Sequence, residues 1–229
     1  MERVNFYSID ELAGSNESQT HHRKRRRQKK FTQLTCEPNP SGLIKEDQEA
    51  LWDSHPHMSE HVAGKLPLCI GMPVMIRHNE ATELCITKGQ EAIVVGWDAV
   101  EGPYGRQVLE TLFVRLVNPP KDVQLADLPT NMVPLTRMTS SIQCRAKSDQ
   151  PLRIKRQQVP VLLNFAMTDY SSQGKTRKYN VVDLGYCRDH QSYYTALSRS
   201  ASAEGTILIQ GFSEEKITCG ISGWLCQEF

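Results

Sequence analysis

The stretch SSQGKTRKYNVVDLG, from Ser171 to Gly185, contains the Gly-Lys-Thr triplet that closes the commonest nucleotide-binding loop. That loop needs a glycine five positions before Gly174, because only a residue without a side chain lets backbone N–H groups wrap around phosphate there. Asp169 stands at that position, and its carboxylate would repel the phosphates. The triplet therefore does not predict a phosphate-binding loop, and a small kinase that holds ATP with Lys175 is disfavoured for the same reason.

Short strands and helices alternate around this stretch. A continuous apolar run, Val159 to Ala166, is typical of a strand buried on both faces of a parallel sheet. Two further strands are predicted at Tyr179–Gly185 and Gly205–Gly211, with a helix between them at Asp189–Ser200 that has Asp189 as its N-cap. A second helical candidate, Ser213 to Phe229, closes the sequence. This order indicates an α/β nucleotide-binding architecture.

The middle of the chain has a β pattern. Three short runs rich in Val, Ile and Leu are bounded by Gly, Pro or Asn, and they are Pro73–His78, Gly89–Trp97 and Glu110–Asn118. Because no long helical pattern separates them, they predict a small barrel with edges near Lys65 and Ala146.

Composition restricts the class of protein. A net charge of +1 over 229 residues argues against a uniformly basic nucleic-acid-binding protein but leaves room for local patches. The seven cysteines include no Cys-x-x-Cys pair, so we expect a reducing compartment and neither a disulfide framework nor a zinc site. The longest nearly apolar run, Leu66 to Ile76, is far shorter than the about 20 residues of a membrane helix. Since Met1–Gly14 has no secretory pattern, we expect an intracellular protein without a membrane partner.

A basic run from His21 to Lys30 interrupts the N-terminal part of the chain. Charges so dense repel one another and stay solvated, so we expect the wider segment 18–45 to be disordered. An exposed linker, a nuclear-targeting signal and a phosphate-binding patch all remain open for the run. A short helix is predicted after it, at Ile44–Trp52.

Two groups of side chains suggest other chemistry. The first is a set of three histidines, His55, His57 and His61, but Pro56 separates the first two and no fourth ligand is near, so a polar loop is favoured over a metal site. The second consists of Cys187, Asp189 and His190, which lie too close in sequence to converge as nucleophile, orienting group and base.

Two late runs carry a resemblance to a known family. FAMTDYSSQGKT, Phe165 to Thr176, and YYTALSRSASAEGTILI, Tyr193 to Ile209, resemble motifs V and VI of superfamily 1 DNA helicases. The similarity is to the five-prime-to-three-prime branch, which includes petite-integration-frequency helicases, RecD-like helicases and the helicase part of helitron transposons. The matching residues of the first motif are Ala166, Thr168, Ser172, Gln173, Gly174 and Thr176. Those of the second motif are Tyr194, Ala196, Leu197, Ser198, Arg199, Glu204 and Gly205.

The middle of the chain resembles the same family. Leu66–Glu80 and Thr87–Trp97 are similar to the entry into a small SH3-type barrel that the family inserts in its second RecA-like domain. The shared residues are Gly71, Pro73, Val74, Met75, Asn79 and Gly89. The sequence departs from the family in motif V, where Tyr170 and Ser171 replace a His-Lys pair.

The resemblance implies an α/β fold, namely a RecA-like second helicase domain of the P-loop NTPase type with an inserted SH3-type β-barrel. Residues 1–64 would form the N-terminal part of the RecA-like domain and would include the basic insertion 18–45. Residues 65–146 would form the barrel, and residues 155–229 the core of the RecA-like domain with motifs V and VI.

The resemblance also implies site residues. Arg199 would act as an arginine finger that presents a cation to the charge developing on the γ-phosphate. The nucleotide-binding residues would be Gln173, Gly174, Ser198 and Arg199. Single-stranded DNA would be contacted by Thr168, Ser172, Lys175 and Thr176. No metal ligand is expected in the chain.

The expected function is that of the C-terminal portion of an ATP-dependent DNA helicase. The sequence has no complete Walker A loop and no Walker B motif, so ATP and Mg²⁺ would bind only when a first RecA-like domain completes the site, and this chain alone would bind neither and hydrolyse no ATP. The expected partners are single-stranded DNA and that N-terminal helicase half. A domain fragment, a truncated gene product and a transposon relic remain open, and the family's work in DNA repair, recombination and telomere maintenance is implied.

A different class of protein stays open as the alternative. A non-catalytic nucleic-acid-binding adaptor derived from a helicase would use the barrel and the basic run, and substitution of Arg199 would leave its DNA affinity unchanged. The basic run makes a nuclear location the first expectation, with another intracellular location as the second.

Overall fold

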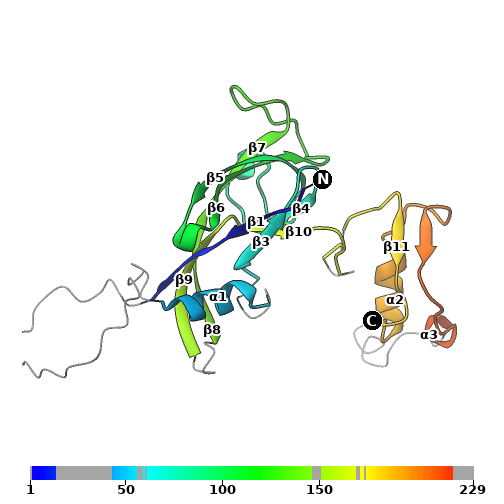
Figure 1. Cartoon of the computed structure of the whole chain (residues 1–229). Helices are drawn as coiled ribbons and strands as arrows, with labels where there is room; N and C mark the ends of the chain where they lie inside the picture. Colours follow the sequence, from blue (N-terminus) through cyan, green and yellow to red (C-terminus); the bar gives the residue numbers. More distant parts are fainter. Residues whose placement is uncertain are drawn as a thin grey trace, which may run out of the picture. The chain divides into compact units, whose positions relative to one another are not determined.

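Two units make up the structure, a computed structural model that describes residues 2–13, 43–55, 59, 61–145, 151–168, 171–172 and 174–218. The first unit is Met1–Asn164 and the second is Phe165–Phe229. Figure 1 shows the elements of each. The basic run 21–30, nearly all of the expected insertion 18–45 and Gln173 lie outside the described residues. None of the helices in the described ranges has the length and apolar composition that a bilayer crossing needs.

A five-stranded antiparallel sheet organises the first unit. The three strands predicted for the middle of the chain are confirmed as β4 (Pro73–Ile76), β5 (Glu91–Glu101) and β6 (Gln107–Leu116). With β7 (Met132–Thr136) and β10 (Val161–Leu163) they form a sheet of order β10-β4-β5-β6-β7. The strands β10 and β7 are its edges, and no pairing between described strands closes it, so the SH3-type barrel stays a prediction.

The largest apolar core of the chain packs against this sheet. Every second residue near the end of β6, Leu112, Val114 and Leu116, is buried, as expected of a strand with one solvated face. Two further strands contribute to the core, β1 (Val4–Tyr7) and β3 (Lys65–Leu68), which pair antiparallel. The sheet and this strand pair therefore bury one continuous apolar cluster. A short 3-10 turn, η2 (Thr82–Leu84), lies between β4 and β5.

The β5–β6 hairpin continues beyond its neighbours in the sheet. Register shifts between Val94 and Gly96 and between Asp98 and Ala99 interrupt its pairing, and such bulges bend a hairpin. The tip is the 3-10 turn η3 (Pro103–Gly105), which lies beside β1 and the helix α1 (Lys45–Asp53) in Figure 1. At the tip the backbone of Tyr104 has a φ of 57°, a left-handed conformation that bulky residues rarely adopt.

A smaller sheet of order β2-β9-β8 completes the first unit. Its strands are β2 (Ile9–Leu12), β8 (Met138–Arg145) and β9 (Pro151–Gln158), and they are all antiparallel. The predicted helix at Ile44–Trp52 is confirmed as α1 (Lys45–Asp53). Leu51 of α1 packs against the sheet in a second apolar cluster, whose buried members are Leu43, Leu51, Val62, Ile142, Cys144 and Ile154.

A fully buried ion pair joins this sheet to α1. The Nε and Nη2 atoms of Arg156 donate to the two carboxylate oxygens of Asp10, both at 2.8 Å. Arg156 also donates to the carbonyl oxygens of Val62 at 3.0 Å and Leu51 at 3.1 Å. The Gln48 amide donates to Asp10 at 3.0 Å. One guanidinium thus connects β9, β2, the end of α1 and the segment that enters β3.

The second unit has the order of elements that the sequence predicts. Its strands β11 (Asn180–Val182) and β12 (Thr206–Leu208) are parallel, and the helix α2 (His190–Leu197) lies between them in the chain. A short helix, α3 (Glu215–Thr218), begins the predicted second helical segment. The buried core of the unit consists of Val182, Leu184, Cys187, Tyr193 and Ala196.

Asp189 is confirmed as the N-cap of α2. Its Oδ1 atom accepts hydrogen bonds from the hydroxyl of Ser192 at 2.7 Å and from the Ser192 backbone N–H at 2.8 Å. These bonds favour the carboxylate form and lower the pKa of Asp189. At pH values above the ordinary pKa of an aspartate the cap contributes fully to the stability of α2. This contribution is lost as the pH falls through the lowered pKa of Asp189.

One face of the small parallel sheet is covered by no described residue. Val181 of β11 and Ile207 of β12 are register partners, and each is 60% exposed. Ile209, two residues after Ile207, is 63% exposed. Parallel sheets in folded proteins are ordinarily covered on both faces, so this apolar surface is unusual.

The prediction for Val159–Ala166 is wrong in its direction of pairing. Only Val161–Leu163 forms a strand, β10, and it pairs antiparallel with β4 at the edge of the first unit's sheet. The start of the run is buried there, whereas Phe165 is 68% exposed. A continuous apolar run reports burial but not the direction of the neighbouring strand, which explains the error.

We predict that Arg156→Ala destabilises the first unit by about 3–5 kcal/mol, because it leaves the Asp10 carboxylate buried without its cation. Urea unfolding followed by tryptophan fluorescence and circular dichroism measures the change. The matched control is Arg153→Ala, three residues earlier on the exposed side of β9, which we expect to change the unfolding free energy by less than about 0.5 kcal/mol. Equal unfolding midpoints for the two variants would contradict the central place of the ion pair.

Candidate nucleotide and nucleic-acid site

A tight turn fixes the first part of the 165–178 loop, which precedes β11. The hydroxyl oxygens of Thr168 and Ser171 lie 2.9 Å apart, and the Ser171 N–H donates to Thr168 Oγ1 at 3.3 Å. The Ser172 N–H donates to the Thr168 carbonyl oxygen at 3.1 Å. Thr168 is exposed and Ser172 is buried, so these two predicted DNA-binding residues lie on the outer and inner sides of one hydroxyl-rich turn.

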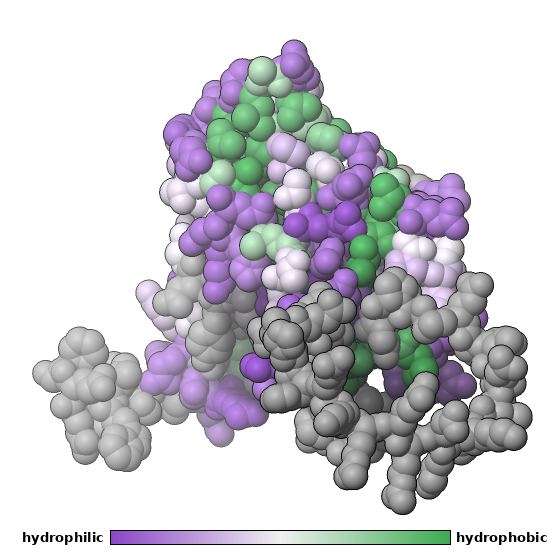
Figure 2. Space-filling view, turned by 90° about the vertical axis from the view of Figure 1, so that its left-hand side faces the viewer, coloured by the Kyte–Doolittle hydropathy of each residue, from purple (hydrophilic) through white to green (hydrophobic). Residues whose placement is uncertain are grey.

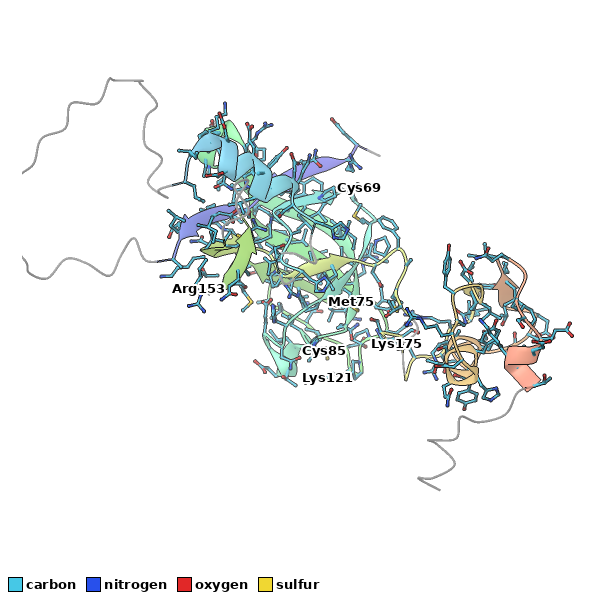
Figure 3. The ribbon with its side chains drawn as sticks, turned by 90° about the horizontal axis from the view of Figure 1, so that it is seen from below. Cys69, Met75, Cys85, Lys121, Arg153 and Lys175 are labelled. Carbon is cyan, nitrogen blue, oxygen red and sulfur yellow. The ribbon has the colours of Figure 1, made fainter. Side chains whose placement is uncertain are left out.

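The other two predicted DNA-binding residues follow on the same loop. The Lys175 N–H donates to the Ser172 carbonyl oxygen at 3.0 Å, after Gly174, whose φ of 79° suits a glycine. Lys175, labelled in Figure 3, is half-buried, and Thr176 is exposed. The loop therefore carries all four predicted DNA-binding residues and Gly174 of the predicted nucleotide-binding set.

Main-chain hydrogen bonds connect this loop to the residues that follow α2. The Arg177 N–H donates to the Arg199 carbonyl oxygen at 2.7 Å, and the Ala201 N–H donates to the Arg177 carbonyl oxygen at 2.9 Å. Arg177 and Ser200 accordingly form a parallel β-bridge. Backbone hydrogen bonds from Arg177, the residue after the first helicase-like run, therefore join the end of that run to the second one.

Asn180 strengthens the same connection, and the sequence analysis did not identify it. Its side-chain amide donates to the Ala196 carbonyl oxygen at 3.1 Å and to the Ser200 hydroxyl at 3.0 Å. The amide therefore binds the last turn of α2 to the start of β11. Arg177 was missed as well, because neither residue belongs to the matched motif positions and their partners lie about 20 residues away in the chain.

Gly205 occupies a position with no room for a side chain. A Cβ atom there would overlap the carbonyl oxygen of Lys178. The Asn180 N–H donates to the Gly205 carbonyl oxygen at 2.8 Å, so β11 and β12 approach closely at this point. This close approach is a physical reason for a glycine at this place in the second motif.

Arg199 lies back along the end of α2. Its Nε donates to the Thr195 carbonyl oxygen at 3.2 Å, and its Nη2 donates to the Ser198 hydroxyl at 2.8 Å. The last carbonyls of a helix carry partial negative charge, which favours a cation there. The side chain is half-buried, and Ser198 is exposed. Ser198 and Arg199 of the predicted nucleotide-binding set are therefore in direct contact.

A surface hollow of about 470 Å³ lies beside this helix end. It is lined by Leu197, Ser200, Ser202, Ala203, Thr206 and Leu208. Some of the lining hydrogen-bonding groups are already used, because Thr206 Oγ1 donates to the Ser202 carbonyl oxygen at 2.8 Å and Ser202 Oγ accepts from the Gly205 N–H at 3.2 Å. The hollow separates the end of α2 from the start of β12.

Groups that could hold a metal ion are not found within the described ranges, where His, Cys, Asp and Glu form no cluster of three. Asp189 is engaged as the cap of α2, and the neighbouring Cys187 is buried, with its carbonyl oxygen accepting from Lys216 Nζ at 2.8 Å. His57 lies outside the described residues.

No protein-family model matches this sequence, and no curated protein matches it. Solved structures do. The Pif1 helicase from Candida albicans matches 99% of this chain with a TM-score of 0.56 and 16% identity, and Pif1 from Bacteroides bound to single-stranded DNA matches 99% with the same TM-score and identity. Bacteroides Pif1 in complex with ADP-AlF3 and single-stranded DNA matches 74% with a TM-score of 0.51 and 19% identity.

These likenesses establish the fold. The chain is similar to 43% of the Candida albicans helicase and to 39% and 35% of the two Bacteroides chains. It therefore has the RecA-like α/β fold, with parallel and antiparallel sheets, of a part of the Pif1 helicases. The α/β fold that the resemblance implied is confirmed.

We predict that Gly205→Ala loosens the second unit, because the added methyl group forces Lys178 and β11 away from β12. Hydrogen exchange followed by mass spectrometry should show faster exchange in peptides that cover α2 and β12. Gly211→Ala is the control, since a Cβ at Gly211 meets no atom within 4 Å. Unchanged exchange in Gly205→Ala would mean that the close approach does not constrain this unit.

Proposed function

We propose that this chain is the C-terminal portion of an ATP-dependent DNA helicase, in which residues 155–229 belong to the second RecA-like domain, residues 65–146 form the inserted SH3-type barrel and residues 1–64 begin the RecA-like domain. The observation that supports this most directly is the pair of backbone hydrogen bonds between Arg177 and the Arg199–Ala201 segment. A helicase must couple the state of its nucleotide to its grip on DNA, and these bonds join the proposed DNA loop to the proposed arginine finger.

Arg199 is the proposed arginine finger. Both acceptors of its present hydrogen bonds, the Thr195 carbonyl and the Ser198 hydroxyl, are neutral. Hydrogen bonds from a guanidinium to phosphate are charge-assisted and about twice as strong, so a γ-phosphate within reach would compete for the side chain. Ser198 would then hold the guanidinium between turnovers, and Gln173 and Gly174 would complete the nucleotide contacts from this chain.

In this proposal ATP and Mg²⁺ bind only when a first RecA-like half completes the site. The described residues offer no carboxylate cluster for Mg²⁺, so this chain fits only the γ-phosphate end of the nucleotide through Arg199. The magnesium–phosphate site would be supplied by the N-terminal helicase half, which is the proposed protein partner. Without that half the chain hydrolyses no ATP.

Single-stranded DNA is the proposed nucleic-acid partner of the 165–178 loop. Lys175 provides a cation for a phosphate, and the exposed hydroxyls of Thr168 and Thr176 can donate to phosphate oxygens. Ser172 is buried and would hold the turn in shape from inside. A nuclear location is proposed from the basic run 21–30, and work in recombination, repair, telomere maintenance or transposition is proposed from the resemblance alone.

We predict that the full chain binds single-stranded oligothymidylate with an affinity that falls as salt rises, and that Lys175→Gln lowers the slope of log affinity against log salt by about 0.7, the contribution of one phosphate contact. Fluorescence anisotropy at several salt concentrations measures the slope. The control is Lys121→Gln, an exposed lysine of the first unit. Identical slopes for wild type and Lys175→Gln would remove Lys175 from the DNA contact.

We predict that Arg199→Ala lowers ATP turnover by about 10³-fold or more when a first RecA-like half of a Pif1 helicase is supplied, and leaves the oligothymidylate affinity of the chain unchanged. The assay is phosphate release in the presence of DNA, with Arg188→Ala, an exposed neighbour of α2, as the control. Arg199-dependent turnover by the chain alone would reveal a complete nucleotide site and overturn the half-helicase proposal. Equal ATP turnover with the wild-type chain and with Arg199→Ala would favour the adaptor, a non-catalytic protein that only binds nucleic acid.

A further inference from the structure

The first unit carries a cluster of aromatic rings and cations that the proposed function does not use. Three rings form its base: Tyr7 and Trp52 contact edge to face with centroids 4.9 Å apart, and Trp52 contacts Tyr104 in the same way at 6.1 Å. Three cations lie over these rings. We call the six residues the cation–aromatic cluster, and they are Tyr7, Lys45, Trp52, Lys65, Tyr104 and Arg106.

Each cation of the cluster is positioned by a ring. The Arg106 guanidinium lies 5.1 Å from the centroid of Tyr7, and Lys65 Nζ lies 5.8 Å from the same centroid. Lys45 Nζ lies 5.9 Å from the centroid of Tyr104. These are ordinary cation–π distances, so the rings restrict where the charges can be. The residues come from β1, α1, β3 and the β5–β6 hairpin, so the fold gathers them from four separate elements.

The cluster has a buried support and an exposed surface. Trp52 is only 4% exposed, and its indole N–H donates to the Ser8 carbonyl oxygen at 3.0 Å. Tyr104 is 39% exposed, and Lys45 and Arg106 are exposed. Figure 2 faces the side that is on the left in Figure 1, and its coloured surface is a mixture of hydrophilic and apolar residues. A ligand can therefore reach the cations and part of a tyrosine ring together.

The backbone at Tyr104 is strained to make this arrangement. Its φ of 57° is rare for a bulky aromatic residue, and such a conformation is unfavourable unless its surroundings stabilise it. The contacts that hold the residue there are its edge against Trp52 and the cation of Lys45. Asparagine or glycine would adopt this positive φ more easily than tyrosine does. The presence of a tyrosine therefore indicates that its ring is needed at this position.

Two cations of the cluster have no carboxylate partner among the described residues. Lys65 lies 3.9 Å from Asp53, whose side chain is 75% exposed. For Lys45 and Arg106 no ion pair with a described residue is found. Acidic residues do occur on the same elements, at Glu46, Asp47 and Glu49 of α1 and at Glu101 of β5. These carboxylates offset the positive charge, so the surface attracts polyanions only weakly through its overall charge. A ligand would instead depend on specific contacts with Lys45, Arg106 and the Tyr104 ring.

We propose that the cation–aromatic cluster is a binding site for single-stranded nucleic acid, separate from the 165–178 loop. A base stacks on the exposed part of the Tyr104 ring, and the neighbouring phosphates bind Lys45 and Arg106. Sequence-tolerant single-strand binding uses this combination of an aromatic platform and backbone-tracking cations. An acidic peptide has carboxylates but no flat ring to stack, and the acidic residues of α1 disfavour it. The proposal needs neither Arg199 nor a nucleotide.

The test measures oligothymidylate binding by the full chain with two cluster variants. Lys45→Gln/Arg106→Gln should lower the salt slope by about 1.4, the value for two phosphates of a single strand. Tyr104→Asn removes the ring and suits a positive φ, and it should weaken binding at least about fivefold, at the low end of the loss for one stacked base, without changing the slope. An unfolding curve for each variant verifies that the fold is retained.

The matched control is Lys121→Gln/Arg153→Gln, which removes the same charge from exposed positions. Figure 3 labels both, and Lys121 lies at the opposite end of the first unit from α1. Crosslinking of 5-iododeoxyuridine oligomers should map to the peptide that contains Tyr104. A control double variant that loses the same slope, an unaffected Tyr104→Asn, or equal competition by polyglutamate would each overturn the proposal. Loss of binding in the cluster variants with none in Lys175→Gln would support this site and reject the loop as the DNA contact.

Discussion

The buried pair of Arg156 and Asp10 is the constraint on which the first unit depends. The two residues are far apart in the chain, and their contact fixes β2 against β9 and closes the last turn of α1 through the Leu51 carbonyl. The next residue is Trp52, which supports the cation–aromatic cluster and is itself tied to Ser8. A charge pair buried this deeply is tolerated because hydrogen bonds use both carboxylate oxygens and each guanidinium nitrogen.

Much of the fold follows from local pattern, and the parts that do not follow have a common cause. The strands β4, β5 and β6 and the β11–α2–β12 order are visible as short apolar runs with turn residues and a capping aspartate. The roles of β2 and β9 are not visible, because an arginine in an alternating polar run predicts a solvated face. Its burial depends on a carboxylate from the other end of the unit. The direction of β10 was missed for the same reason, since the partner strand decides it.

The candidate site shows the same division. Ser198 and Arg199 were singled out by the resemblance to the second helicase motif, which is a continuous run of sequence and can therefore be matched without a structure. Arg177 and Asn180, which bind the two motifs together, act through partners on another element and leave no sequence signal. The structure adds that the guanidinium of Arg199 is hydrogen-bonded at the end of its own helix, so the proposed contact with a phosphate would require an exchange of partners.

The exposed sheet face of the second unit has a practical consequence. Val181, Ile207 and Ile209 present branched apolar side chains on a two-stranded sheet, and strands of this composition pair readily with copies of themselves. The chain should therefore self-associate in solution, and the self-association should increase with protein concentration and with kosmotropic salt. An additive or a co-expressed protein that prevents this self-association would be a candidate ligand of the exposed sheet face.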